Sequence, residues 1–131
     1  DDWKHWIDAD GDCQNTRAEI LIRDSQQPVQ FKSNRQCKVT GGLWVLPYTG
    51  GTVTNARQLD IDHIIPLKWA HGHGGDRWTS RQKQAFANDP ENLLATSSSA
   101  NRSKGAKGPD DWMPTVDQCQ YAKWWEYLLG K

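Results

Sequence analysis

The chain contains the segment Asp60-Ile61-Asp62-His63-Ile64-Ile65-Pro66-Leu67. Its apolar and β-branched residues predict a strand over residues 59–65. Pro66 ends this strand, because proline has no backbone N–H to donate to a sheet. The segment therefore places a carboxylate, Asp62, and an imidazole, His63, next to each other near the end of a strand.

Two asparagines follow this strand in the sequence. Asn92 begins residues 92–96, whose sequence Asn-Leu-Leu-Ala-Thr is consistent with a second short strand. Asn101 lies within residues 97–104, which predict a short helix with a serine cap and a stop at Gly105. We therefore expect one α+β domain over residues 1–131, with a core motif at about 59–105 and helices on either side.

The remaining elements are predicted from caps and turn residues. Thr16 and Glu19 have the spacing of a capping box that opens a helix, and Thr79 and Gln82 are the cap partners of a helix predicted over residues 79–88. The other expected elements are a reversal at 47–51 between two strands, a loop at 68–75, and a terminal helix at 115–129. The cap pair of that helix is Thr115 and Gln118, and its buried side is expected to contain Val116, Cys119, Trp125, Leu128 and Leu129.

Composition limits the function less than the distribution of charge does. Sixteen Lys and Arg balance sixteen Asp and Glu, but the basic residues lie mainly in the middle and later parts of the chain, where they could form a local positive surface. No apolar run is long enough for a membrane span, and no signal peptide is visible. We expect a secreted or extracellular monomer with no membrane partner.

Three cysteines leave three disulfide pairings open. We favour the pair Cys13–Cys37, because both residues lie in the N-terminal half of the chain. Cys119 is then expected to be a free, buried apolar side chain.

The polar residues of the core motif have the chemistry that phosphodiester hydrolysis needs. His63 could accept a proton from water, because imidazole titrates near neutral pH. Asp62 and Asn101 offer hard oxygen ligands for one divalent cation, most simply Mg²⁺. Asn92 could hydrogen-bond across the loop that follows His63 and hold it in place. The basic residues Arg102 and Lys104, next to Asn101, could bind flanking phosphates.

These residues resemble the motif of the HNH endonuclease family. The resemblance includes Asp62-His63-Ile64-Ile65-Pro66, Asn92 and the segment from Asn101 to Gly105. It extends to residues 12–17, 48–50, 86–90 and 107–109, which are similar to segments of small secreted microbial HNH nucleases.

This resemblance implies a ββα-metal fold with His63 as general base, Asp62 and Asn101 as metal ligands, and Asn92 as an orienting residue. Many members have histidine at the last position, where this chain has Asn101. An all-oxygen pair favours magnesium or manganese over zinc or nickel, so the identity of the metal stays open.

Other polar residues could support the site or bind a different ion. Arg17 lies in a family-like segment and is expected to bind phosphate, while Asp60 and Glu19 could hold the ligands in place through hydrogen bonds. Asp8, Asp10 and Asp12 partly imitate a calcium loop, but Gly11 falls at the wrong place for an EF-hand turn. His71 and His73 are expected to be exposed on a loop, although a substrate contact by either stays open.

We therefore expect a metal-dependent endonuclease that cuts DNA with little sequence preference. Two alternatives are an RNA-preferring nuclease and a non-catalytic nucleic-acid-binding module on the same fold. A calcium-stabilised secreted structural domain, built on the N-terminal aspartates, is a third. The sequence does not indicate the biological role or whether an inhibitor or immunity protein exists.

Overall fold

The computed structural model describes residues 3–8 and 10–131, and these form a mixed α and β fold. The helices are α1 (Thr16–Asp24), α2 (Leu67–Gly72), α3 (Ser80–Ala87), α4 (Ser98–Lys104) and α5 (Gln118–Leu129). The strands are β1 (Gln30–Phe31), β2 (Val39–Val45), β3 (Thr52–Asn55), β4 (Leu59–His63) and β5 (Leu93–Ser97). Short 3₁₀ turns are η1 (Ala56–Gln58), η2 (Gly75–Arg77) and η3 (Pro90–Asn92). None of the helices in the described residues is long and apolar enough to cross a membrane.

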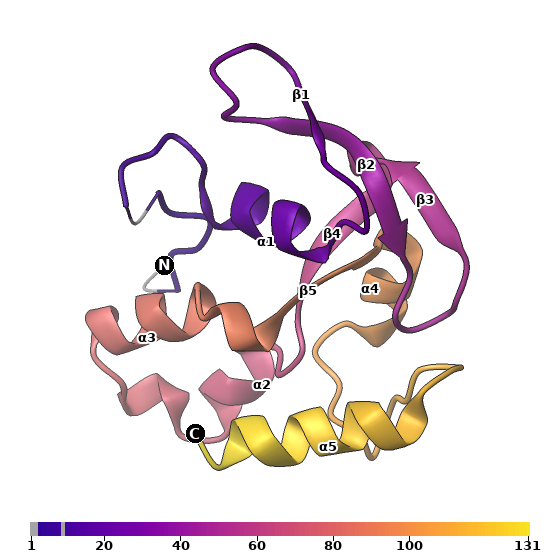
Figure 1. Ribbon diagram of the computed structural model, residues 1–131. Helices are drawn as coiled ribbons and strands as arrows, with labels where there is room; N and C mark the ends of the chain where they lie inside the picture. Colours follow the sequence, from indigo (N-terminus) through magenta and orange to yellow (C-terminus); the bar gives the residue numbers. More distant parts are fainter. Residues whose placement is uncertain (1–2, 9) are drawn as a thin grey trace.

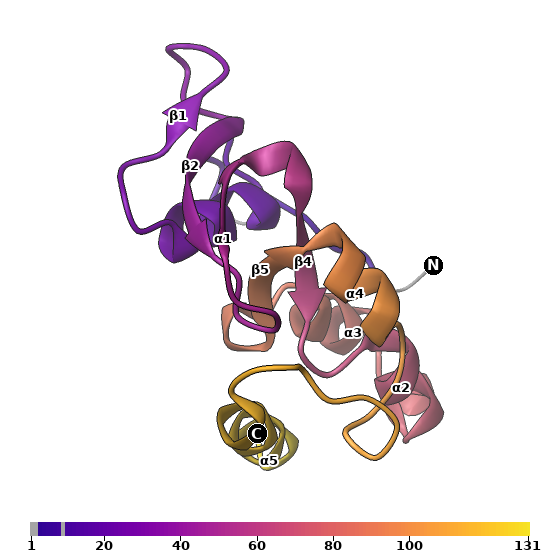
Figure 2. The ribbon, with the colours of Figure 1, turned by 90° about the vertical axis from the view of Figure 1, so that its right-hand side faces the viewer.

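Two antiparallel sheets organise the chain. β1, β2 and β3 form one sheet in that order, and β4 pairs with β5 in the other, with His63 opposite Leu93. Figure 1 shows the three-stranded sheet at one end of the molecule and α5 at the other, with β4 and β5 between them. Seen from the side in Figure 2, α4 lies against β4 and β5, so these three elements form the expected ββα unit.

The β4–β5 pair separates two apolar clusters. Leu59 and Ile61 of β4 pack with α1 and the three-stranded sheet in one cluster. The second cluster joins Ile64 and Ile65, just after β4, to the aromatic residues of α5. Since side chains alternate along a strand, Asp60 and Asp62 face away from the first cluster and toward α4.

Most of the predicted elements are confirmed. The reversal at 47–51 connects β2 to β3, and β4 and β5 occupy the two predicted strand segments. Thr79 and Gln82 form a complete capping box for α3, and Ser97 caps α4 through the backbone N–H of Ala100. Cys13 and Cys37 are joined by a disulfide, as expected.

Four local predictions are wrong, and three of them involve caps or helix boundaries. Asn15, not Thr16, caps α1, because the Thr16 hydroxyl donates instead to Asn88 at 2.7 Å. Residues 67–72 are helical rather than a loop, since packing of Ala70 in the second cluster overrides the weak local propensity. Helix α5 begins at Gln118, because Thr115 donates both its N–H and its hydroxyl to the Tyr48 carbonyl.

The buried side of α5 also differs from the prediction. Trp125 and Leu128 are buried as expected, and Tyr121 completes this side at positions i, i+4 and i+7. Cys119 is exposed, and Leu129 is 58% exposed. The later start of α5 explains the error in part, because Val116 lies before the helix.

Candidate active site

Asp60 and Asn101 meet at the junction of β4 and α4. The Asn101 side-chain amide donates to Asp60 Oδ2 at 3.1 Å, and the Ser98 hydroxyl donates to Asp60 Oδ1 at 2.9 Å. Since the Asn101 nitrogen is engaged by Asp60, its Oδ1 atom is the part of the amide left to bind another group. Asp60 was expected to hold a ligand in place through a hydrogen bond, and its contact with Asn101 agrees with that expectation.

Asp62 is buried and has a partner on each oxygen. Lys104 Nζ lies 3.2 Å from Oδ1, and the Tyr48 hydroxyl donates to Oδ2 at 2.5 Å. Lys104 also donates to the His63 carbonyl at 2.8 Å. Lys104 was expected to bind a phosphate. It is instead fully buried and its charge is paired with Asp62, so it is not available to a phosphate.

Burial shifts the pKa of Asp62, Lys104 and Tyr48. Desolvation raises the pKa of Asp62 and lowers that of Lys104, and their mutual attraction opposes both shifts. Desolvation, followed by the charge of Asp62, raises the pKa of Tyr48 well above its usual value. The Tyr48 hydroxyl therefore stays protonated and remains a hydrogen-bond donor to Asp62.

The ring of His63 has a fixed orientation. Its Nε2 atom lies 2.9 Å from the Ala87 carbonyl, which can only accept, so Nε2 carries the hydrogen and Nδ1 is the basic atom. Trp6 stacks on the ring with centroids 5.5 Å apart and planes 6° apart. Burial is the main cause that lowers the pKa of His63 to about 4. The imidazole is therefore neutral at physiological pH, as a proton acceptor must be.

Asn92 holds the chain directly after His63, as predicted. The fully buried Asn92 side chain accepts from the Ile65 N–H at 2.8 Å and donates to the Ile65 carbonyl at 3.1 Å. The Asn92 carbonyl also accepts from the Ile64 N–H at 2.8 Å. Asn92 therefore acts by fixing the backbone beside His63.

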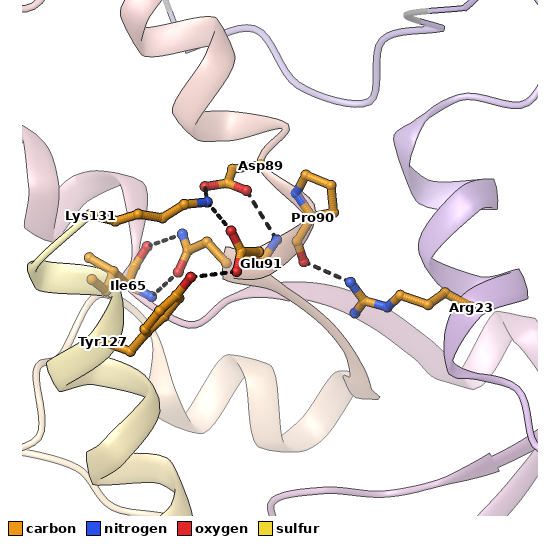
Figure 3. Close-up of polar contacts among 8 residues, drawn as sticks. Arg23, Ile65, Asp89, Pro90, Glu91, Tyr127 and Lys131 are labelled. Atoms are coloured by element: carbon orange, nitrogen blue, oxygen red, sulfur yellow. Dashed lines mark hydrogen bonds and ion pairs between the residues drawn. The ribbon is translucent and has the colours of Figure 1, made fainter.

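The turn that carries Asn92 is held from two sides, as Figure 3 shows. Arg23 of α1 donates to the Pro90 carbonyl at 2.7 Å. At the end of α5, Lys131 lies 2.8 Å from Asp89 and 2.5 Å from Glu91, and the Tyr127 hydroxyl donates to Glu91 at 2.8 Å. Residues of α1 and of the C-terminal segment thus fix the turn that carries Asn92, and Asn92 in turn fixes the backbone beside His63.

One cavity brings most of the expected residues together. It has a volume of about 440 Å³, and the polar expected residues that line it are Arg17, Asp60, Asp62, His63 and Asn101. Arg17 comes from α1, where its guanidinium donates to the Ala56 carbonyl at 3.0 Å and interacts with the charge of Asp60. The cavity therefore combines a base, three oxygen-bearing side chains and a cation.

Besides Lys104, three expected site residues do not line this cavity, namely Asn92, Arg102 and Glu19. Asn92 is fully buried, and Arg102 is exposed on α4. Glu19 lies beside Asp10, where desolvation and the neighbouring aspartates raise its pKa. It cannot hold the ligands in place from there, because α1 turns its side chain toward the N-terminal loop.

The structure also reveals residues that the sequence alone did not assign. Tyr48 was placed in a turn and in a family-like segment but received no role in the site, and its bond to Asp62 depends on how the β2–β3 connection packs. His5 and Trp6 line the cavity beside His63, although nothing in their local sequence indicates it.

The N-terminal aspartates, and His71 and His73, do not line this cavity. Within the described residues, only Asp8, Asp10 and Asp12 form a group of three or more such side chains close enough to share an ion, and these carboxylates are exposed. Within the described residues, His71 and His73 do not form such a group with His63. His71 accepts from the Trp3 indole at 3.4 Å, and His73 stacks on Trp69.

Comparison with known proteins identifies the family. Residues 15–128 match the family described as GmrSD restriction endonucleases, C-terminal domain. The chain belongs to this family, whose description agrees with the resemblance to endonucleases noted in the sequence. No solved structure shows a significant match to the chain.

A relative from Arthroderma benhamiae is described as an uncharacterized secreted protein. It is 40% identical over 129 residues, which cover 95% of this chain and 61% of the relative. The chain thus spans about three-fifths of the length of this relative.

Proposed function

We propose that the chain is a metal-dependent HNH-type endonuclease that hydrolyses DNA phosphodiester bonds with little sequence preference. The observation that carries this proposal is the cavity in which Arg17, Asp60, Asp62, His63 and Asn101 meet. The family supports a nucleic-acid substrate. We further propose that the protein is secreted, in keeping with its disulfide and with the description of its relative.

The donor set fits a hard divalent cation such as Mg²⁺. Asp60, Asp62 and Asn101 supply carboxylate and amide oxygens at one cavity, which are the ligands that such a cation prefers. These residues would hold the ion, with Asp62 contributing only through lone pairs that Tyr48 and Lys104 leave free. When bound, the ion would supply positive charge that stabilises the phosphate during hydrolysis.

The protein residues divide the remaining work. His63 Nδ1 accepts a proton from water, and the water oxygen bonds to phosphorus as the bond from phosphorus to the 3′ oxygen breaks. The leaving oxygen takes a proton from solvent, so the products carry a 5′-phosphate and a 3′-hydroxyl. Arg17 neutralises charge on the phosphate, and the bond from His63 Nε2 to the Ala87 carbonyl keeps Nδ1 toward the cavity.

Supercoiled plasmid cleavage tests this proposal. We expect wild type to be inactive in EDTA and active with added magnesium or manganese, and zinc and calcium should be compared. His63→Ala should abolish cleavage but retain DNA binding, whereas His71→Ala, which removes an exposed histidine outside the cavity, should cut normally. Cleavage by His63→Ala at the wild-type rate would refute the role of His63, and no cleavage by wild type with any ion would favour a binding module.

One observation favours RNA as a second candidate substrate. His5 lies 5.9 Å from His63 between ring centroids, and both line the cavity. Because a pair of imidazoles can serve as base and acid for attack by a 2′-hydroxyl, such cleavage needs no metal. Cleavage of RNA that persists in EDTA and disappears in His5→Ala would support this alternative over DNA hydrolysis.

A further inference from the structure

A second hollow adjoins the candidate active site. It has a volume of about 1040 Å³ and is formed by α1 together with the β1–β2–β3 sheet. We call it the basic groove, because its charged lining residues are Arg17, Lys32, Lys38 and Arg57, and no aspartate or glutamate among residues 3–8 and 10–131 lines it. The whole chain has a formal net charge of zero, so this is a local concentration of positive charge.

Arg17 connects the basic groove to the active-site cavity. It is the one residue among those lining the two hollows that belongs to both. Its guanidinium is held by the Ala56 carbonyl at 3.0 Å, at the boundary between β3 and β4. A strand of substrate that places one phosphate beside His63 could therefore continue past Arg17 into the basic groove without leaving positively charged surface.

The framework that carries these cations is fixed by covalent and backbone bonds. The Cys13–Cys37 disulfide lines the groove and ties the N-terminal loop to the β1–β2 connection. The backbone N–H of Lys32 donates to the Lys38 carbonyl at 2.9 Å, which closes that connection. Lys32 and Lys38 have exposed side chains on this framework, as expected for residues that meet a ligand from solvent.

We propose that the basic groove binds the nucleic-acid strand that flanks the scissile phosphate, through its phosphodiester backbone. This inference rests on the proposed function, because it extends the same substrate beyond the active site. No aromatic side chain in the described part of the chain lines the groove for bases to stack on, so its contacts are with phosphates and carry little sequence information. Low sequence preference is the consequence.

A matched pair of charge-reversal variants tests this proposal. Lys38→Glu/Arg57→Glu changes the groove, whereas Arg77→Glu/Lys123→Glu changes exposed cations that line neither hollow. Each pair reverses two charges, so both lower the net charge from 0 to −4. Thermal melts establish that both variants fold before binding is compared.

Binding is measured by fluorescence anisotropy of a labelled oligodeoxynucleotide in EDTA, over a series of salt concentrations. For the groove variant we expect affinity to fall at least about tenfold and the slope of log K against log salt to shrink by about 1.5–2. The control should change affinity by less than about threefold. The same binding measurement with an RNA oligonucleotide of the same sequence shows whether the groove binds DNA or RNA more tightly.

Cleavage assays separate this proposal from the proposed function. With a small chromogenic phosphodiester, which is too short to reach the groove, the groove variant should retain the wild-type rate, whereas its KM for polymeric DNA should rise. If wild type cuts nothing, the proposed function fails while the binding comparison still decides the groove. Equal loss of affinity in both variants, or equally tight binding of poly-glutamate by wild type, would overturn the inference.

Discussion

Replacing Lys104 by methionine tests whether the buried ion pair with Asp62 is as important as the structure indicates. Lys104 is fully buried and Asp62 is 3% exposed, so the substitution leaves a carboxylate in the interior without its cation. Breaking a buried pair costs about 3–5 kcal/mol. Since Tyr48 still donates to Asp62, we expect a loss of about 3 kcal/mol, or ~10 °C in melting temperature.

The assay is urea unfolding followed by the fluorescence of the eight tryptophans. The double variant Lys104→Met/Asp62→Asn removes both charges and should recover most of the loss. Burial already raises the pKa of Asp62, and an acid whose folded pKa is raised stabilises the fold at low pH and loses that stabilisation as pH rises through the folded pKa. The loss in Lys104→Met should therefore be smaller at pH 4 than at pH 7.

Two outcomes would contradict this reasoning. A loss below about 1 kcal/mol for Lys104→Met would mean that water or rearrangement replaces the cation at little cost. A double variant as unstable as the single one would show that the methionine disturbs packing, rather than that the carboxylate lacks a partner.

Three further predictions concern the rest of the framework. Asn92→Ala should lower the free energy of unfolding by about 2–4 kcal/mol and reduce kcat, because it strands the buried N–H and carbonyl of Ile65, and an unchanged kcat in a folded variant would contradict the positioning role. Cys13→Ser should cost about 3–4 kcal/mol by opening the loop closed over a separation of 24 residues, whereas Cys119→Ser, at an exposed position, should leave urea unfolding unchanged. His63 has a folded pKa of about 4, below its usual 6.5, so the stability that its neutral form contributes is present above pH 6.5 and is lost as pH falls toward 4. The difference in unfolding free energy between wild type and His63→Gln, measured in EDTA, should change over this pH range. A difference that stays constant with pH would refute the burial of a neutral imidazole.

The core motif was predictable because its signals are local. The β-branched residues before Pro66, the serine before α4 and the glycine after it each act within a few residues. The capping box of α3 is likewise complete in four residues. These signals set the order strand, strand, helix, and that order is enough to bring Asp60 and Asn101 together.

The errors arose where distant contacts outweigh local preference. Thr16 and Thr115 have the sequence context of caps, but each hydroxyl finds a partner elsewhere, on Asn88 and on the Tyr48 carbonyl. Residues 67–72 are helical because Ala70 is buried against the second apolar cluster. Cys119 is exposed because the buried side of α5 consists of Tyr121, Trp125 and Leu128, and Cys119 does not share that side.

The sequence by itself predicted the ββα order and singled out His63 as the candidate base, because these depend on neighbouring residues and on caps. Only the tertiary structure decided that Lys104 pairs with Asp62 instead of facing a phosphate, and that Trp6 stacks on His63. It also placed Lys38 and Arg57 in one groove with Arg17. These contacts join residues far apart in the chain, and their geometry depends on how helices and sheets pack, which no local pattern of residues encodes.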